Sequence, residues 1–264
     1  MTQQAAPASS PAQTSEGTNM ADISVVKEPE FRDDVTVQLI RSAAQDSDVV
    51  WSARVSTAGE TSVSAVDQDP AEAKGLINFL LKNRHGTPFE HNSMTFMISA
   101  PIFVFREFHR HRVGWSYNEE SGRYRQLEPV FYLPSTDRKL IQVGKAGHYT
   151  FEDGTPEQYE TVRSATIRSC TEAYNSYQEM LDAGVAREVA RAVLPVATYS
   201  TMYATCNARS LMSFLSLRTK NEDSAFPSYP QREIEMVAEK MEAEWAQLMP
   251  ITYDAFISAG RVSP

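Results

Sequence analysis

The spacing of apolar residues along the chain predicts its secondary structure before any motif is considered. Apolar residues alternate with polar ones from 35 to 40 and again from 93 to 99, which is the period of a strand. Helical spacing predicts helices over 46–55 and from Pro70 to 84, and a third helix beginning at Pro101 and ending near Arg110. The first part of the chain is therefore expected to mix strands and helices.

The rest of the chain is predicted to be mainly helical. Two glycines and an asparagine place 113–122 in a loop, whereas aromatic and β-branched residues predict strands over 130–133 and 198–206. Helical periodicity predicts further helices over 156–183, 186–193, 207–218 and 230–249. Helices outnumber strands and do not alternate with them regularly, so the fold class expected is α+β, one sheet with helices packed against it.

Length and composition indicate a globular domain. The chain has 264 residues, of which 42% are hydrophobic and 22% are charged, and this balance can build a sizeable core. Residues 1–34 are predicted to form a disordered N-terminal tail, because Gln, Ala, Ser, Pro and Thr dominate the start of the chain. Residues 35–264 are predicted to form the folded domain.

The overall charge narrows the possible partners. A formal net charge of -9 argues against nucleic acid or an anionic membrane as a partner, because both select spread-out basic surfaces. The uncharged run 92–105 is too short to span a membrane and contains Pro101. The only two cysteines, Cys170 and Cys206, are far apart, which fits a reducing cytoplasm and excludes a disulfide framework.

Basic residues are nevertheless concentrated between Arg106 and Arg125, where five arginines and two histidines accompany three glutamates. One interpretation is a solvated helix end with i,i+4 ion pairs. The segment continues, however, into Ser121, Gly122 and Arg123. There a hydroxyl can donate, a glycine lets a ligand approach the backbone, and a guanidinium can fork onto a phosphate. This combination favours one mononucleotide phosphate beside a larger, phosphate-bearing cofactor.

Other candidate sites are less informative. Arginines recur in 187–191 and 207–218, but such arginines are more often ion-pair partners than ligands. The histidines show no zinc spacing, so no metal site is expected. Cys206 lies among apolar and aromatic residues, which favours an inert buried thiol over a nucleophile. Neither a glycine-rich dinucleotide motif nor a P-loop occurs, so a flavin or nicotinamide would not bind on a Rossmann turn.

The residues Arg110, His111 and Arg112, followed after eight residues by Ser121, resemble the signature of the flavin-dependent thymidylate synthases. Further segments are similar to blocks of this family and occur in the family's order, namely 53–56, 85–91, 100–104, 187–195 and 207–218. The resemblance extends over most of the chain from Val35 onward. Several separate matches in one order argue against coincidence.

The resemblance implies an enzyme that transfers a methylene group from methylenetetrahydrofolate to deoxyuridine monophosphate (dUMP) and reduces it to the methyl group of thymidylate. FAD would carry the hydride, and NADPH would reduce the FAD. The resemblance also implies a single domain with a twisted, mainly antiparallel sheet flanked by helices. Such chains would assemble into a homotetramer with active sites built between subunits.

Roles for individual residues follow from the same resemblance. Arg218 matches the arginine with the family's active-site role, which is to favour ionisation of the uracil ring at N3. FAD would be bound by Ser56, Thr87, Glu90, Arg110, His111, Arg112, Asn118, Glu119, Asn207, Arg209 and Ser213. The nucleotide would be bound by Glu107, Arg110, Glu119, Glu120, Ser121, Gly122, Arg123, Arg191 and Arg218.

Three features depart from the family pattern. Glu107 stands where many relatives carry glutamine, which adds a negative charge near the nucleotide, and Ser213 stands where some relatives carry asparagine. The segment 220–230 is longer than in compact relatives and is a candidate for shaping substrate access.

Two alternatives stay open at this point. The first is a nucleic-acid-binding module that clamps a phosphate backbone with 106–125, and the acidic balance of the chain argues against it. The second is a non-catalytic carrier of flavin or nucleotide, and the retention of Arg218, Ser121 and Arg123 argues against that.

Overall fold

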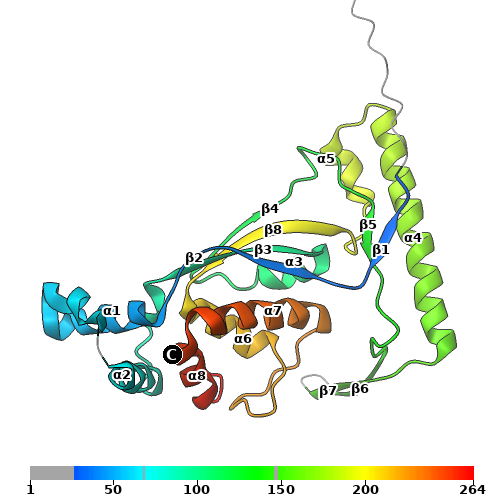
Figure 1. Ribbon diagram of the computed structural model, residues 1–264. Helices are drawn as coiled ribbons and strands as arrows, with labels where there is room; N and C mark the ends of the chain where they lie inside the picture. The colour runs from blue at the N-terminus through cyan, green and yellow to red at the C-terminus, as the bar shows by residue number, and fades with distance from the viewer. Residues whose placement is uncertain (1–26, 68, 146–147) are drawn as a thin grey trace, which may run out of the picture.

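The computed structural model describes residues 27–67, 69–145 and 148–264, and its centre is a four-stranded antiparallel sheet (Figure 1). The strand order is β2-β3-β8-β4, and every neighbouring pair is antiparallel. These strands are β2 (Thr36–Ala43), β3 (Ser93–Pro101), β8 (Tyr199–Cys206) and β4 (Trp115–Glu119). The expected fold class, α+β with an antiparallel sheet flanked by helices, is confirmed.

One face of this sheet forms the main core. Alternate side chains of β3, including Phe96 and Ile98, are fully buried, as are Met202 and Ala204 on β8. Four of the helices that build this core lie on one side of the sheet (Figure 1), namely α3 (Ile102–Phe108), α6 (Ala208–Arg218), α7 (Arg232–Leu248) and α8 (Pro250–Ser258). Side chains on the opposite face are less buried, and Tyr203 is 47% exposed there.

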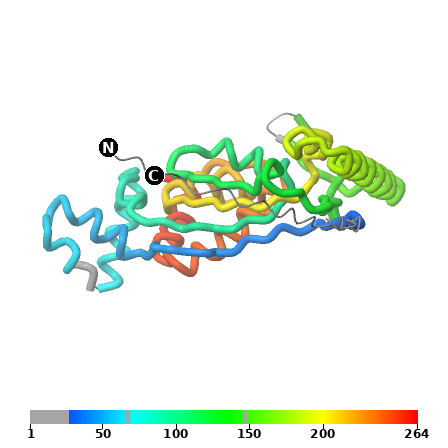
Figure 2. The backbone as a smooth tube through the Cα atoms, turned by 90° about the horizontal axis from the view of Figure 1, so that it is seen from above, coloured from blue at the N-terminus to red at the C-terminus, as the bar shows by residue number. Residues whose placement is uncertain are grey.

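Smaller units lie at the two ends of the sheet (Figure 2). At one end are α1 (Asp46–Ala58), η1 (Gly59–Asp67), α2 (Pro70–Lys82) and η2 (Thr87–Glu90). Towards the other end are α4 (Pro156–Asp182), α5 (Arg187–Ala190), η3 (Arg191–Val193), the parallel pair β1 (Glu30–Arg32) and β5 (Val130–Tyr132), and the hairpin β6 (Ile141–Lys145) and β7 (His148–Glu152). A second, small core joins α4 to β5 through Phe131, Tyr174 and Tyr177.

Two predictions about strands need correction. The segment 113–122, predicted to be a loop, contains β4, because Trp115 and Tyr117 alternate with polar residues and pair with β8. Gly114, with φ 69°, completes the turn just before the strand begins. The strand predicted at 130–133 is β5, which pairs in parallel with β1 instead of joining the central sheet.

Order also begins earlier than expected. The predicted tail, 1–34, overlaps β1, because the three residues of β1 form a ladder with β5. Residues 1–26 lie outside the described residues, so the prediction of a tail there stays a prediction. The hairpin β6–β7 and helix α8 were not predicted, since both are short and carry a weak periodic signal. None of the described helices combines the length and apolar character needed to cross a bilayer.

Helix α8 depends on a cap that comes from a distant helix. Asp46, the first residue of α1, accepts hydrogen bonds from the backbone N–H of Ile251 at 2.9 Å and of Thr252 at 2.8 Å. The Thr252 hydroxyl also donates to it, at 2.6 Å. The residue preceding α8 provides no side-chain cap, so Asp46 satisfies N–H groups that would otherwise lack a partner. These hydrogen bonds connect the start of α1 to the start of α8.

Asp46→Ala is expected to lower the free energy of unfolding by about 1–3 kcal/mol, because it leaves buried helix-terminal N–H groups without an acceptor. Urea unfolding of the full chain measures the change. Asp254→Ala, which alters an exposed acid on the same helix, is the matched control and should change stability by less than about 0.5 kcal/mol. Equal losses in the two variants would contradict the proposed cap.

Candidate functional site

A cavity of about 570 Å³ lies where the turn after α3 meets η2 and α6. It brings together seven residues that the sequence had singled out, which are Glu90, Arg110, His111, Arg112, Arg209, Ser213 and Arg218. Trp115 and the last two residues, Ser263 and Pro264, line the same cavity, and no sequence signal pointed to them. Basic side chains from two distant parts of the chain therefore meet at one place, as expected.

Arg218, the last residue of α6, is held on two sides in this cavity. Its Nη1 donates to Glu107 Oε2 at 2.6 Å, and its Nε donates to His111 Nε2 at 3.1 Å. The side chains of Arg218 and Glu107 are only 19% and 23% exposed, so this ion pair is better shielded from water than most surface pairs. The orientation of the guanidinium is thus set by both neighbours.

His111 is neutral in this arrangement. A ring nitrogen that accepts a hydrogen bond from a guanidinium must carry a lone pair, so the proton lies on Nδ1. Burial, and after it the charge of Arg218, lowers the pKa of His111 from 6.5 to about 4. The residue that the sequence presented as a protonatable member of a cationic run therefore serves as an acceptor.

The pKa of Glu107 is shifted in the opposite direction, upward. Burial raises the pKa of its carboxyl group, the charge of Arg218 works against that rise, and Glu233 adds to it. The pKa of Glu107 is therefore raised overall, even though its carboxylate is paired with Arg218. Glu107 therefore lies beside Arg218, and its expected contact with the nucleotide stays a prediction.

Local packing explains how the Arg-His-Arg segment reaches α6. Asn207 caps α6 by accepting a hydrogen bond from the Ser210 N–H at 2.8 Å, and the Ser210 hydroxyl donates to the Val113 carbonyl at 2.8 Å. A Cβ on Gly114 would collide with Ser210, and φ 69° is costly for other residues. Asn207, proposed from the sequence to contact a flavin, uses its side-chain oxygen as a helix cap in this structure.

Arg209 lines the cavity together with Glu90 and Pro264. It pairs with Glu90 at 2.6 Å and donates to the Pro264 backbone oxygen at 2.8 Å. A Cβ on Gly86 would overlap the Arg209 guanidinium, so a larger residue there would force that side chain to move. The side chains of Arg209 and Glu90 are 41% and 37% exposed, so this pair is much more accessible than the one at Arg218.

A second cluster forms around Ser121, Gly122, Arg123 and Arg191. Arg123 Nε donates to Glu188 Oε2 at 2.9 Å, and both side chains are about half exposed. A Cβ on Gly122 would come within 3.2 Å of Arg191, so glycine permits this close approach. Glu188 was missed in the sequence, because nothing in its local pattern indicates a partner for Arg123.

Strand β4 separates the two clusters within one chain. Trp115 at its start pairs with Cys206 and lines the cavity, whereas Glu119 at its end pairs with Met202. Five residues of strand extend roughly 15 Å, so Arg123 lies well away from Arg218. The chain therefore carries two half-sites, a cavity half-site around Arg218 and a loop half-site around Arg123.

Several predicted site residues lie outside the cavity half-site. Ser56 lies on the exposed side of α1, and Thr87 begins η2. Asn118 and Glu119 are exposed on β4, beyond the end that reaches the cavity. Glu120 pairs with Arg125 at 3.1 Å, close to the loop half-site in sequence.

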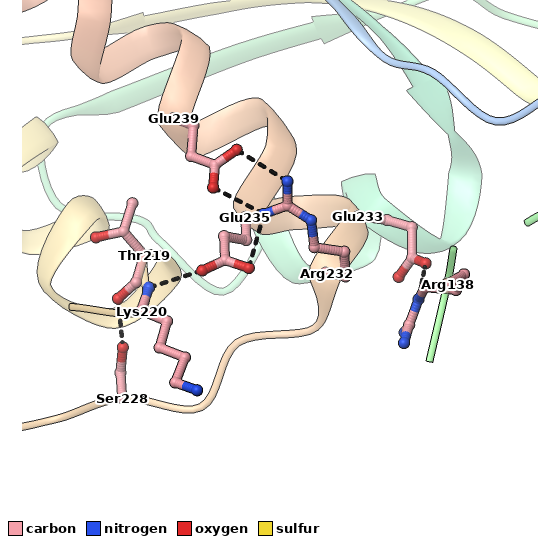
Figure 3. A network of polar contacts seen from close by, with 8 residues as sticks. All are labelled: Arg138, Thr219, Lys220, Ser228, Arg232, Glu233, Glu235 and Glu239. Atoms are coloured by element: carbon pink, nitrogen blue, oxygen red, sulfur yellow. Dashed lines mark hydrogen bonds and ion pairs between the residues drawn. The ribbon is translucent and has the colours of Figure 1, made fainter. Parts of the chain in front are cut away.

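The segment that follows Arg218 is held by the polar network that Figure 3 shows. The Ser228 hydroxyl donates to the Thr219 carbonyl at 2.8 Å, and the Lys220 N–H donates to Glu235 Oε1 at 2.9 Å (Figure 3). Glu235 is in turn paired with Arg232 on α7 at 2.9 Å (Figure 3). Both ends of the long 220–230 segment are thus fixed close to the catalytic candidate.

Among the described residues, no three His, Cys, Asp or Glu side chains lie together in a way that would hold a metal ion. Cys206 is completely buried, and burial raises the pKa of its thiol. Cys170 is also buried, and its pKa is raised for the same reason. Neither thiol has the exposed, electropositive surroundings of a reactive cysteine.

Comparison with known proteins identifies relatives of this chain. The sequence model of a family described as "Thymidylate synthase complementing protein" matches residues 38–251. A flavin-dependent thymidylate synthase of Streptomyces coelicolor is 67% identical over 89% of this chain and 96% of its own length. One from Tropheryma whipplei is 56% identical over 90% of this chain and 99% of its own length.

A solved structure shares both sequence and fold. It is the crystal structure of a UMP/dUMP methylase, PolB from Streptomyces cacaoi, bound with 5-Br UMP. It is 52% identical, covers 90% of this chain and all of its own chain, and superposes with a TM-score of 0.83.

The neutral state of His111 leads to a prediction about pH and stability. Its pKa in the folded chain, about 4, is below the ordinary 6.5, so between these values the unfolded chain binds more protons. Stability should therefore fall as the pH falls through this window. His111→Gln keeps an acceptor for Arg218 but cannot be protonated, and is expected to flatten that decline. The decline is measured as the free energy of unfolding of each variant at several pH values between 7 and 4.

His109→Gln, which removes an exposed imidazole two residues away, is the control and should keep the decline of the wild type. A decline in His111→Gln as steep as in the wild type would show that His111 is not held neutral by its surroundings.

Proposed function

The chain belongs to the flavin-dependent thymidylate synthases, and from this premise we propose that its two half-sites bind FAD and dUMP next to each other. It is a methyltransferase that converts dUMP to thymidylate. The observation that carries the proposed use of the site is the Arg218 guanidinium, fixed between Glu107 and His111 in a basic cavity. Methylenetetrahydrofolate is the proposed one-carbon donor, and NADPH the proposed reductant.

The cavity half-site fits a flavin that carries a diphosphate, such as FAD. Arg110 and Arg112 are exposed in its lining and form no ion pair with any described residue, so both charges can meet phosphate oxygens. Arg209 is paired with Glu90 at a partly exposed position, where a phosphate can replace the carboxylate at low cost. When bound, the flavin supplies the hydride for the reduction.

Arg218 is proposed to act on the uracil ring. C5 of uracil is a weak nucleophile, and loss of the proton at N3 moves electron density towards C5. A guanidinium that is already fixed stabilises this anion without having to reorganise. Glu107 and His111 hold the guanidinium in place before the nucleotide binds. This mechanism needs no enzyme nucleophile, which agrees with the buried cysteines.

The loop half-site is proposed to bind the nucleotide phosphate. Ser121 offers a hydroxyl, Arg123 a guanidinium that is already oriented by Glu188, and Arg191 a second guanidinium beside Gly122. A phosphate can displace Glu188 from Arg123 cheaply, because both side chains are about half exposed.

Because β4 keeps the two half-sites apart within one chain, we propose that each complete site combines half-sites of different subunits. The uncovered face of the sheet, with Tyr203 and Ile40 exposed, provides a surface for such contacts. The loop half-site is bordered by further exposed apolar residues, namely Val189, Val193 and Val196. A closed homotetramer is the proposed assembly.

The test of the function is a spectroscopic one. The purified protein is expected to be yellow and to lose its flavin absorbance with NADPH under anaerobic conditions. Adding dUMP and methylenetetrahydrofolate should restore the absorbance and yield thymidylate. A yellow protein that never forms thymidylate would support the non-catalytic carrier instead, and a colourless protein would remove the role proposed for the cavity.

Shared sites lead to a complementation experiment. Arg218→Ala and Arg123→Ala are each expected to lower turnover by roughly 100–1000-fold as homo-oligomers, since each removes a charge that faces the nucleotide. The first should retain flavin, and the second should mainly weaken nucleotide binding. When the two chains are co-expressed, random mixing should restore about a quarter of the wild-type rate, because some sites then contain both arginines.

Arg163→Ala, which alters an exposed arginine on α4, is the control and should be fully active alone. No recovery in purified mixed oligomers would show that each subunit builds its site by itself.

A further inference from the structure

We propose that Tyr117 is a positioning residue for the reaction, because its hydroxyl holds the turn that presents His111 to Arg218. Tyr117 lies on β4 and does not line the cavity that contains Arg218. This inference rests on the proposed role of Arg218.

The Tyr117 hydroxyl bridges the two ends of the turn after α3. Its Oη is 3.0 Å from the Phe108 carbonyl oxygen and 2.9 Å from the His111 carbonyl oxygen. One proton serves both acceptors, so the hydroxyl holds the two carbonyls at a fixed spacing. The His111 N–H also donates to the Phe108 oxygen at 2.8 Å, which makes this a closed turn with the hydroxyl at its centre.

The tyrosine ring is held in place by other contacts. It stacks on Trp115 with a centroid distance of 5.7 Å and an interplanar angle of 10°. It meets Phe108 and His109 edge to face, at 6.4 Å and 5.4 Å. Pairing of Tyr117 with Ala204 sets its register on the sheet. Burial raises the pKa of the phenol, so the hydroxyl keeps its proton and remains a donor.

The imidazole of His111 extends from this turn to Arg218. Phe214 packs against it edge to face at 4.9 Å, and Trp115 lies at 6.5 Å on another side. The ring is thus placed by its backbone turn and by two aromatic neighbours. The Arg218 Nε hydrogen bond depends on that placement, because it needs Nε2 within reach and the lone pair directed at the donor.

The charged groups around His111 come from several elements. Arg218 faces it from α6, and Arg110 and Arg112 flank it in the same turn. The carboxylates of the neighbourhood are Glu107, bound to Arg218, and Glu90 across the cavity. A shift of the turn would move His111 away from Arg218, and the pKa of the imidazole would report that movement directly.

Tyr117→Phe removes only the hydroxyl and keeps the stacked ring. Its expected effects are a roughly tenfold lower kcat, retention of flavin, and little change in the KM for dUMP, since positioning of Arg218 matters most in the transition state. The matched control is Tyr199→Phe. Tyr199 is a buried tyrosine of this sheet whose hydroxyl also donates to a backbone carbonyl, that of Asp34 at 2.5 Å, and its loss should leave kcat unchanged.

A second readout is independent of turnover. The full chain contains only five histidines, so an NMR titration of histidine-labelled protein resolves His111 once His111→Gln has identified its signal. The pKa of His111 is about 4 in the wild type, and Tyr117→Phe is expected to raise it towards 6.5, whereas Tyr199→Phe should not. An unchanged His111 pKa in a folded Tyr117→Phe variant would overturn the proposal.

A double-mutant cycle separates positioning from general weakening of the fold. In a His111→Ala background, Tyr117→Phe should change kcat by less than about twofold, because its route to Arg218 is already gone. A tenfold loss in both backgrounds would mean that Tyr117 acts only on overall structure. If Arg218→Ala leaves turnover intact, the proposed function of Arg218 fails, while the His111 titration still decides the link between Tyr117 and His111.

Discussion

The ion pair between Arg218 and Glu107 is the contact on which the arrangement of the site depends. A guanidinium that is only 19% exposed needs a carboxylate close by, and its remaining Nε–H needs an acceptor. Glu107 supplies the first and neutral His111 the second. Both requirements can be met only if the end of α6 lies against α3 and the turn that follows it, so this contact fixes how the two helices meet.

Two other arginines of the half-sites are also paired with a glutamate. Arg209 is paired with Glu90, and Arg123 with Glu188, in a chain whose net charge is -9. An acidic chain can in this way hold several guanidiniums ready without exposing a broad basic surface. The exposed pairs are weak and open easily to an anionic ligand, whereas the shielded pair at Arg218 is the one that persists. The difference in burial therefore separates the arginines proposed to bind ligands from the arginine proposed to act on the uracil ring.

Strand β4 gives the molecule its division into two half-sites. It is short, with Trp115 and Tyr117 on one side and Ser116 and Asn118 on the other, and among the described residues it pairs with β8 alone. Its start supports the cavity half-site through Trp115, and its end leads directly into the loop half-site at Ser121. A signature that looks continuous in the sequence is thus stretched across the sheet, which is why a single chain does not bring all of its members together.

The sequence by itself determined the main helices and most strands, because periodicity is a local signal, and its resemblance to a family selected seven residues of the cavity half-site. It did not point to Trp115, Ser263 or Pro264, which line the same cavity. The local signals at 113–122 gave a wrong prediction, because glycine and asparagine indicated a loop where β4 lies. Only the tertiary structure decided that Trp115 and Tyr117 form a strand, since their partners on β8, Cys206 and Ala204, come from a distant part of the chain. The neutral His111 and the pairing of Arg123 with Glu188 were likewise decided by contacts between distant segments, where burial and charge, rather than residue type, set the chemistry.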